Sequence, residues 1–285
     1  MSSRRKLSVM RTARPVMVVV VLSVALAVAC SRTPPASEPS PSVTPSPQAS
    51  PIPRASPAAT LPSPQPTPPA TLFPSSLGGQ DLTRIPTTAR IVALTFDAGA
   101  NADAVPAILK ALKDEGITAT FFLTGDFVHE FPDASKAIVQ GGHRLANHSM
   151  THPHLPALSN AQIRAQIRDA GVAIQTVTGK NPQPYFRFPY GDRNPGTIEI
   201  VNSLGYVAVR WTVDSLGWQG TSKHTAESVA QRVLGTAQPG QIVLMHVGSN
   251  PDDDSILDAD ALPAVINGLR TKGYAFVTLD ALLAA

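Results

Sequence analysis

The sequence predicts an α/β fold, a (β/α) barrel of about seven parallel strands, preceded by a disordered N-terminal segment. Two observations lead to this prediction. Residues 78–285 contain 14 of the 15 aromatic residues and all 19 glycines, and aromatic side chains build hydrophobic cores. Within this region, short apolar runs alternate with helical patterns. Such units in series are typical of a parallel sheet, and their number favours a barrel.

The domain is expected to begin with a buried strand. Residues 91–96 form an apolar, β-rich run that is typical of such a strand. Apolar residues at helical spacing predict a helix over 102–115, and residues 118–123 predict the next strand. Residues 144–146 are a candidate short strand.

A long helix over residues 159–177 opens the second half. Its apolar residues share one face, Ser159 is a plausible N-cap, and Gly179 follows its end. The remaining expected elements are strand 185–188, helix 196–203, strand 206–213, helix 226–234, strand 241–246, helix 261–272 and strand 274–279. In such barrels the chemistry takes place at the C-terminal ends of the strands.

Residues 1–29 are typical of a signal peptide. Five basic residues precede an uncharged, mostly apolar stretch over 16–29, which is short for a bilayer span. The chain's one cysteine, Cys30, follows at the cleavage position, and this arrangement resembles a bacterial lipobox. It implies a lipid anchor at the outer face of the cytoplasmic membrane, with ordinary cleavage and secretion as the alternative. Ser3-Arg4-Arg5 also resembles a twin-arginine export signal.

Residues 30–77 are dominated by Pro, Ser, Thr and Ala, and such a composition predicts a disordered, semi-rigid linker. The domain is therefore expected to span 78–285. Without residues 1–29 the chain has 18 basic and 20 acidic residues, a net charge of −2. We therefore expect no nucleic-acid partner, and we expect a monomer. A single cysteine also excludes an internal disulfide and a thiolate zinc finger.

Polar residues collect where the expected strands end. Asp97 follows the first strand, and His148 and His152 have the spacing of a pair that can bind one metal. Arg187 and Tyr190 close one later strand. Asp214 and His246 close two others. Each residue alone is a weak signal, whereas the set in this order is specific.

In order and spacing, these segments resemble the polysaccharide deacetylase family, also called carbohydrate esterase family 4 or the NodB-homology domain. The resemblance covers about residues 90–283. It implies a distorted (β/α) barrel and a hydrolase of linear amides, which removes N-acetyl groups from amino-sugar polymers such as peptidoglycan or chitin by metal-activated water. It also implies a glycan partner, an extracytoplasmic location and a divalent metal, zinc or else cobalt or another transition metal.

The resemblance also implies roles for single residues. Asp97 corresponds to the catalytic base, Arg187 orients it, and His148 and His152 are metal ligands.

The remaining matches concern the acid and the substrate. His246 corresponds to the general acid, and Asp214 pairs with it and raises its pKa. The backbone N–H of Tyr190 helps to hold the oxyanion. Trp218 and Leu244 form an apolar wall around the acetyl methyl group.

Two positions depart from the family pattern. The first motif usually has two adjacent acids, of which the second is a metal ligand, but Ala98 follows Asp97 here. The fourth motif often has an acid just before its tryptophan, where this chain has Gly217. We expect the second departure to affect the rim of the cleft more than the chemistry.

Three interpretations of the missing acid stay open. In the first, which we favour, His148 and His152 hold the metal, with Asp97, water, Asn101 or Asp103 completing its ligands. In the second, the domain is a catalytically impaired module that binds glycan. In the third, it acts on another acyl group.

A barrel glycosidase is a further class of function to consider. It needs two facing carboxylates, for which Asp97 and Asp214 are candidates, but it gives the histidine pair no role. The run 252–254, three consecutive aspartates, is expected to be a solvated turn.

Overall fold

The structure, a computed structural model, describes residues 72–284. The predicted signal peptide, Cys30 and most of the predicted linker lie outside these residues. The packed region begins slightly before the expected boundary at Gly78, because Phe73 and Leu77 are buried in a hydrophobic cluster of the domain.

Within residues 72–284, nine strands form one sheet, and all pairings between these strands are parallel. The path is β1-β6-β5-β4-β3-β2-β8-β7, and β9 pairs with β2. The strands are β1 Asp81–Leu82, β2 Ile91–Ala98, β3 Thr120–Leu123, β4 Arg144–Asn147, β5 Tyr185–Phe186, β6 Val207–Val209, β7 Val213–Asp214, β8 Gln241–His246 and β9 Ala275–Val277. The predicted parallel barrel is confirmed, with more and shorter strands than expected.

The sheet curls because the segment after β1 reaches across to β8. Arg84 forms an antiparallel bridge with Gln241, and the Ile85 N–H donates to the Gly240 carbonyl at 2.8 Å. The edge strand β1 is thereby tied to the beginning of β8. The barrel is consequently distorted and closed by a loop bridge instead of a full strand pair.

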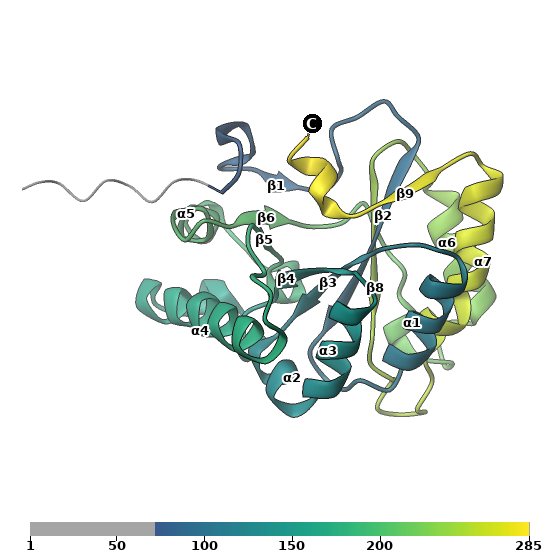
Figure 1. Cartoon of the computed structure of the whole chain (residues 1–285), viewed down its shortest axis with the longest axis horizontal. Helices are drawn as coiled ribbons and strands as arrows, with labels where there is room; N and C mark the ends of the chain where they lie inside the picture. Colours follow the sequence, from purple (N-terminus) through teal and green to yellow (C-terminus); the bar gives the residue numbers. More distant parts are fainter. Residues whose placement is uncertain (1–71, 285) are drawn as a thin grey trace, which may run out of the picture. The chain divides into compact units, whose positions relative to one another are not determined.

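In the described part of the chain, seven α-helices cover the sheet (Figure 1). They are α1 Val105–Asp114, α2 Gly125–Glu130, α3 Pro132–Gln140, α4 Asn160–Thr178, α5 Pro195–Ser203, α6 Ala226–Gly235 and α7 Leu257–Thr271. None of the helices described is long and apolar enough to cross a membrane.

Side chains of β2 alternate between two environments. Leu94, Phe96 and Ala98 belong to the large cluster that includes buried residues of α1, α6 and α7. Ala93 belongs instead to the second cluster, formed mainly by other strands. Residues two apart on a strand share a face, so Asp97 lies on the side of Ala93 and Ala98 on the side of the helices.

The limits of α4 agree with the sequence analysis. Ser159 accepts a hydrogen bond from the Gln162 N–H while the Gln162 side chain accepts one from the Ser159 N–H, which is a capping box. Gly179 follows with φ of 71°, a left-handed conformation that glycine adopts at little cost. Both ends of this helix are therefore encoded locally.

The strand expected over 206–213 is broken into β6 and β7. Between them the Arg210 N–H donates to the Leu82 carbonyl, and the Thr212 N–H donates to Ile242, at 2.7 and 2.8 Å. The chain thus changes its pairing partner within three residues. A long-range exchange of this kind is not visible in local sequence.

Candidate active site

The predicted catalytic side chains meet at the carboxyl ends of the strands. Asp97 in β2 and His246 in β8 are direct partners in the parallel register. His148 follows β4 and Arg187 follows β5, and these two strands are neighbours. The sheet therefore brings residues from distant parts of the sequence to one edge.

Arg187 is fully buried and holds the carboxylate of Asp97. Its guanidinium donates to Asp97 Oδ1 at 2.6 Å and to Thr95 Oγ1 at 3.0 Å. It also donates to the backbone carbonyls of Val209 and Arg210, at 3.3 and 2.9 Å. The geometry fits the orienting role that the sequence predicts for this arginine.

The charge of Asp97 is favoured by its neighbours. Burial alone would raise the pKa of its carboxyl, but the Arg187 guanidinium, with His148 and His246, holds that pKa below its ordinary value. Asp97 is therefore ionised at neutral pH. Its second oxygen, Oδ2, lies 3.4 Å from Nε2 of His148.

His148 and His152 point their Nε2 atoms at each other, 3.1 Å apart. The Nδ1 atom of His148 lies 2.9 Å from the Arg187 carbonyl, to which it donates when protonated, so Nε2 carries the free electron pair. Burial lowers the pKa of both imidazoles, that of His152 to about 4. Both rings are accordingly neutral near pH 7, the form that binds metals.

The loop that carries this pair is held by its own polar residues. Ser149 and His152 have positive φ, 69° and 57°, and the Ser149 N–H donates to Asn147 Oδ1 at 2.9 Å. Gln166 of α4 accepts from the N–H groups of Met150 and Thr151, at 3.0 and 2.9 Å. The turn is therefore held by side chains that the sequence analysis did not single out.

The geometry of the two imidazoles fits a metal. Two nitrogens bound to one zinc at about 2.0–2.1 Å lie roughly 3.3 Å apart in tetrahedral geometry, close to the observed 3.1 Å. The bond between His148 and a carbonyl is the usual support of a metal-ligating imidazole. Among residues 72–284, however, no group of three or more His, Cys, Asp or Glu side chains is placed to hold a metal ion.

Asn101 and Asp103 are not placed as further metal ligands. Asn101 Oδ1 accepts from the Ser249 N–H at 2.8 Å, and Asp103 Oδ2 accepts from the Ser249 hydroxyl at 2.6 Å. Both side chains hold the loop after β8 near the start of α1. These contacts engage one oxygen of each residue and give no support to the alternative in which either one completes the metal site.

The partner of His246 differs from the one predicted. Its Nδ1 lies 3.5 Å from Oδ2 of Asp258, a buried residue in the first turn of α7. The expected partner, Asp214, instead accepts from the Leu216 N–H at 2.9 Å. Burial lowers the pKa of His246, but Asp258 first, and then Asp97 and Asp214, raise it above its ordinary value overall. The pairing assigned to Asp214 is thus corrected, while a smaller electrostatic contribution remains.

Exposed aromatic rings lie on both sides of the buried residues. Tyr190, 62% exposed and with φ of 58°, packs against the ring of His152 and stacks on His154 at 4.1 Å. On the other side Trp218, 49% exposed, lies edge to face with His246 at 6.4 Å. Leu244 is buried in β8, two residues before His246 and on the same face.

The acidic run has a structural role beside Trp218. Asp253 Oδ2 accepts from the Thr221 N–H at 2.7 Å, and Asn250 Nδ2 donates to the Trp218 carbonyl at 2.9 Å. Asp253 is exposed, as expected for a solvated turn, but it also ties this turn to the loop that carries the tryptophan.

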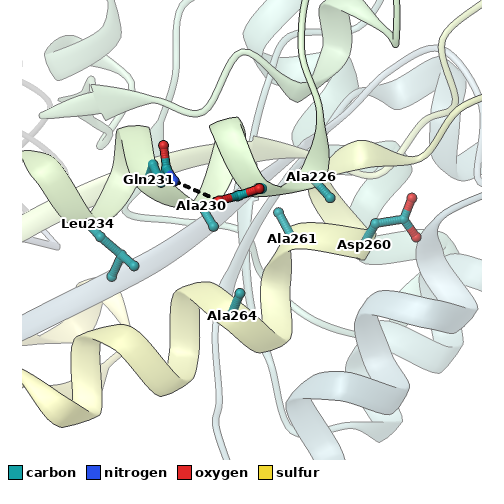
Figure 2. Close-up of a pocket in the computed structure, with 8 residues that line it drawn as sticks. Ala226, Ala230, Gln231, Leu234, Asp260, Ala261 and Ala264 are labelled. Atoms are coloured by element: carbon teal, nitrogen blue, oxygen red, sulfur yellow. Dashed lines mark hydrogen bonds between the residues drawn. The ribbon is translucent and has the colours of Figure 1, made fainter.

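A surface hollow of about 370 Å³ lies elsewhere, between α6 and α7 (Figure 2). Its lining is mainly alanine and leucine, with a hydrogen bond between Glu227 and Gln231 at 2.9 Å on one wall. It contains none of the predicted catalytic residues, so we assign the chemistry to the strand ends.

Some residues of the site had little signal in the sequence. Asp258 has the pattern of an ordinary acid in the first turn of a helix, and His154 that of a loop residue. His154 proves to pair with Asp192 at 2.9 Å as well as stacking on Tyr190.

Comparison with known proteins agrees with this geometry. Residues 84–209 match the family model described as polysaccharide deacetylase. The chain is 35% identical over 191 residues to a peptidoglycan-N-acetylglucosamine deacetylase of Bacillus cereus, covering 67% of each chain. It is 30% identical over 194 residues to a chitooligosaccharide deacetylase of Azorhizobium caulinodans, covering 65% of this chain and 91% of the relative.

This chain is also similar in structure to a solved protein. It is a mutant of a Bacillus anthracis protein, described as a pseudoenzyme of carbohydrate esterase family 4 with restored enzymatic activity. The TM-score is 0.64 at 31% identity, and the match covers 70% of each chain. The same fold is thus found in both active and inactive relatives.

Proposed function

Because this chain belongs to the polysaccharide deacetylase family, we propose that it hydrolyses N-acetyl groups of an amino-sugar polymer, of the peptidoglycan or chitin type. The observation that carries the proposal is the joint placement of Asp97, Arg187, His148 and His246 at one edge of the sheet. Relatives of this chain are named for deacetylation of peptidoglycan and of chitooligosaccharides.

A divalent metal, with zinc as first choice, would be held by His148 and His152. When bound, the metal supplies polarisation of the amide carbonyl and lowers the pKa of water, to about 7 in well-studied zinc enzymes. The two neutral imidazoles with facing Nε2 atoms support this assignment.

On the base side, Asp97 accepts a proton from the attacking water. Arg187 fixes one oxygen of this carboxylate, which leaves the other to face the substrate side near His148. As the amide carbon becomes tetrahedral, its oxygen gains negative charge, and backbone donors are worth about 3–4 kcal/mol there. We assign one such donor to the N–H of Tyr190.

On the acid side, His246 gives a proton to the nitrogen of the leaving amine. The carbon–nitrogen bond breaks as this proton arrives, and acetate and a free amino sugar are released. A raised pKa keeps more of His246 protonated near neutral pH, which suits a general acid. Trp218 and Leu244 are placed to enclose the acetyl methyl group.

A second candidate function is an impaired domain that binds glycan without turnover. Ala98 favours it, because the family's third protein ligand is missing and no described acid replaces it. The exposed rings of Tyr190 and Trp218 would serve such a module equally well.

We also propose that the protein works outside the cytoplasm, since peptidoglycan lies there, and that Cys30 carries a lipid anchor. Labelling with a radioactive fatty acid tests the anchor. Incorporation into the wild type but not into Cys30→Ser is expected, and equal labelling of both would contradict it.

The activity is tested by acetate release from N-acetylglucosamine oligomers, peptidoglycan and chitin, using the full chain loaded with zinc or cobalt. Release that stops on chelation and returns with metal supports the proposal. His246→Ala should lose turnover and keep its metal. Glycan binding without acetate release on any substrate would favour the second candidate.

A further inference from the structure

Gly217 lies against the carboxylate of a residue from another element. A Cβ atom built at Gly217 would lie 2.5 Å from Oδ1 of Asp258 and 2.7 Å from its Cγ. The space in front of Gly217 is therefore filled by the acid group of α7. Gly217 is also the position at which the family pattern often has an acid of its own.

Asp258 is in contact with His246 at two points. Its Oδ2 accepts the backbone N–H of His246 at 2.8 Å and lies 3.5 Å from Nδ1 of the same residue. In the described part of the chain neither His246 Nδ1 nor Asp258 Oδ1 has a hydrogen-bond partner. Both atoms are buried, and Nδ1 lies only slightly beyond hydrogen-bond distance of Oδ2.

An ordinary helix-end acid would not have these properties. Asp260 is also in the first turn of α7, but it is exposed. Asp258 is 4% exposed, and a carboxylate is rarely buried without a partner. Its burial is accounted for by His246.

We propose that Asp258 is the positioning residue for His246, and that it supplies from α7 the carboxylate that Gly217 lacks. It holds Nδ1 protonated and turns Nε2 toward the substrate. The inference rests on the proposed function for its catalytic meaning. The pairing itself is a property of the protein alone.

The charged groups around His246 must be separated in any test. Asp258 approaches from α7, Asp97 from β2 and Asp214 from β7, while His148 and His152 follow β4. Asp258→Asn removes the charge and keeps an oxygen for the His246 N–H. Asp214→Asn tests the alternative partner, and Asp260→Asn is the matched control for charge at the start of α7.

The first measurement does not depend on turnover. The full chain, metal-free and with isotope-labelled histidine, is titrated by NMR, and His246 is assigned from the spectrum of His246→Gln. We expect Asp258→Asn to lower the pKa of His246 by about one unit, the size of a close charge contact. Asp214→Asn and Asp260→Asn should change the pKa of His246 only by about a few tenths of a unit. An unchanged pKa in Asp258→Asn, or a larger shift in Asp214→Asn, would overturn the proposal.

The second measurement is a swap. In Gly217→Asp/Asp258→Ser the carboxylate returns to the family position, and the collision at Gly217 is removed. This variant should titrate like the wild type even where Asp258→Asn does not fold. If His246 in this double variant titrates like an exposed imidazole, the result counts against the pairing.

Kinetics then test the catalytic meaning. Asp258→Asn should lower kcat roughly 100-fold, within the range of general acid–base catalysis, with KM little changed, and the swap should restore most of it. Equal kcat in Asp258→Asn and the wild type would remove the catalytic role. A wild type that releases no acetate would refute the proposed function, while the NMR result would still decide the pairing.

Discussion

The candidate site has two sides, one around His246 and one around the proposed metal pair His148 and His152. Each side lacks an acid that the family pattern often has, and the two positions are occupied differently. On the acid side, the space at Gly217 is filled by the carboxylate of Asp258. On the metal side, Ala98 is fully buried in the cluster beneath the helices, and no described acid takes its place.

The difference follows from where each position lies. Gly217 begins a short 3-10 helix, Gly217–Gln219, beside the first turn of α7, so a side chain of α7 can reach its space. Ala98 ends a central strand and has its methyl group in the apolar layer. In this molecule a side chain from another element occupies the space at Gly217, whereas apolar packing surrounds Ala98.

The largest effect is expected on the metal side, from His148→Ala. This variant loses one of two imidazoles and should lose bound metal and at least about 1000-fold in acetate release, as expected when a catalytic metal is removed. Elemental analysis and a kinetic assay measure both. His154→Ala removes an exposed imidazole nearby and should keep its metal. Full metal content in His148→Ala would refute the assignment.

The buried ion pair should dominate stability. Arg187→Met leaves the carboxylate of Asp97 buried and unpaired, and the free energy of unfolding should fall by about 3–5 kcal/mol. Urea denaturation measures the change. Lys110→Met breaks an exposed pair with Asp114 and should cost less than about 1 kcal/mol. Equal losses of unfolding free energy in the two variants would show that the buried pair stabilises the fold no more than the exposed pair.

Placing at position 98 the acid that the family pattern usually has tests the proposed metal site. Ala98→Asp should raise zinc affinity by at least the 10- to 100-fold that even a second-shell partner contributes, as measured by competition with a chelator. Ala98→Asn has the same shape without the charge and should gain less. If neither variant binds zinc more tightly, the space at this position does not reach the metal.

The smallest expected effects concern the pH dependence of folding stability. Its sign is opposite for His152 and His246. The pKa of His152 is lowered to about 4 by burial, so the unfolded chain binds this proton more readily, and stability is lost as pH falls from 6.5 toward 4. The pKa of His246 is raised, so its contribution is present below 6.5 and is lost as pH rises through the folded value.

Chemical denaturation of the metal-free protein across this range measures both contributions. His152→Gln should flatten the acid side of the stability profile by about 1 kcal/mol after allowing for solvent screening. His246→Gln should flatten the side above pH 6.5. Two variants that flatten the same side would contradict the opposite shifts.

Many element boundaries of this structure could be predicted from local sequence. Ser159 and Gly179 marked both ends of α4, and the run 241–246 matched β8. The catalytic candidates were predictable because strand ends of a parallel sheet meet at one edge. What local sequence lacked was the exchange of partners between β6 and β7, the short helices α2 and α3, and the earlier start of α7.

Asp214 was assigned to His246 from the family resemblance alone. The helix was expected from residue 261, whereas α7 begins at Leu257 and has Asp258 in its first turn. Burial of a helix-end carboxylate depends on which strand lies beneath it. This information resides in the tertiary contacts of α7 and β8.

Arg187 contributes both to the packing of the barrel strands and to the geometry of the candidate site. Its guanidinium binds β2 through Thr95 and Asp97 and reaches the carbonyls of Val209 and Arg210, while its own carbonyl accepts from His148. The proposed base, one of the two proposed metal ligands and the strands around them therefore depend on a single residue. The catalytic geometry should disappear in the same cooperative transition as the barrel, so that a partly unfolded chain is inactive toward any glycan it meets.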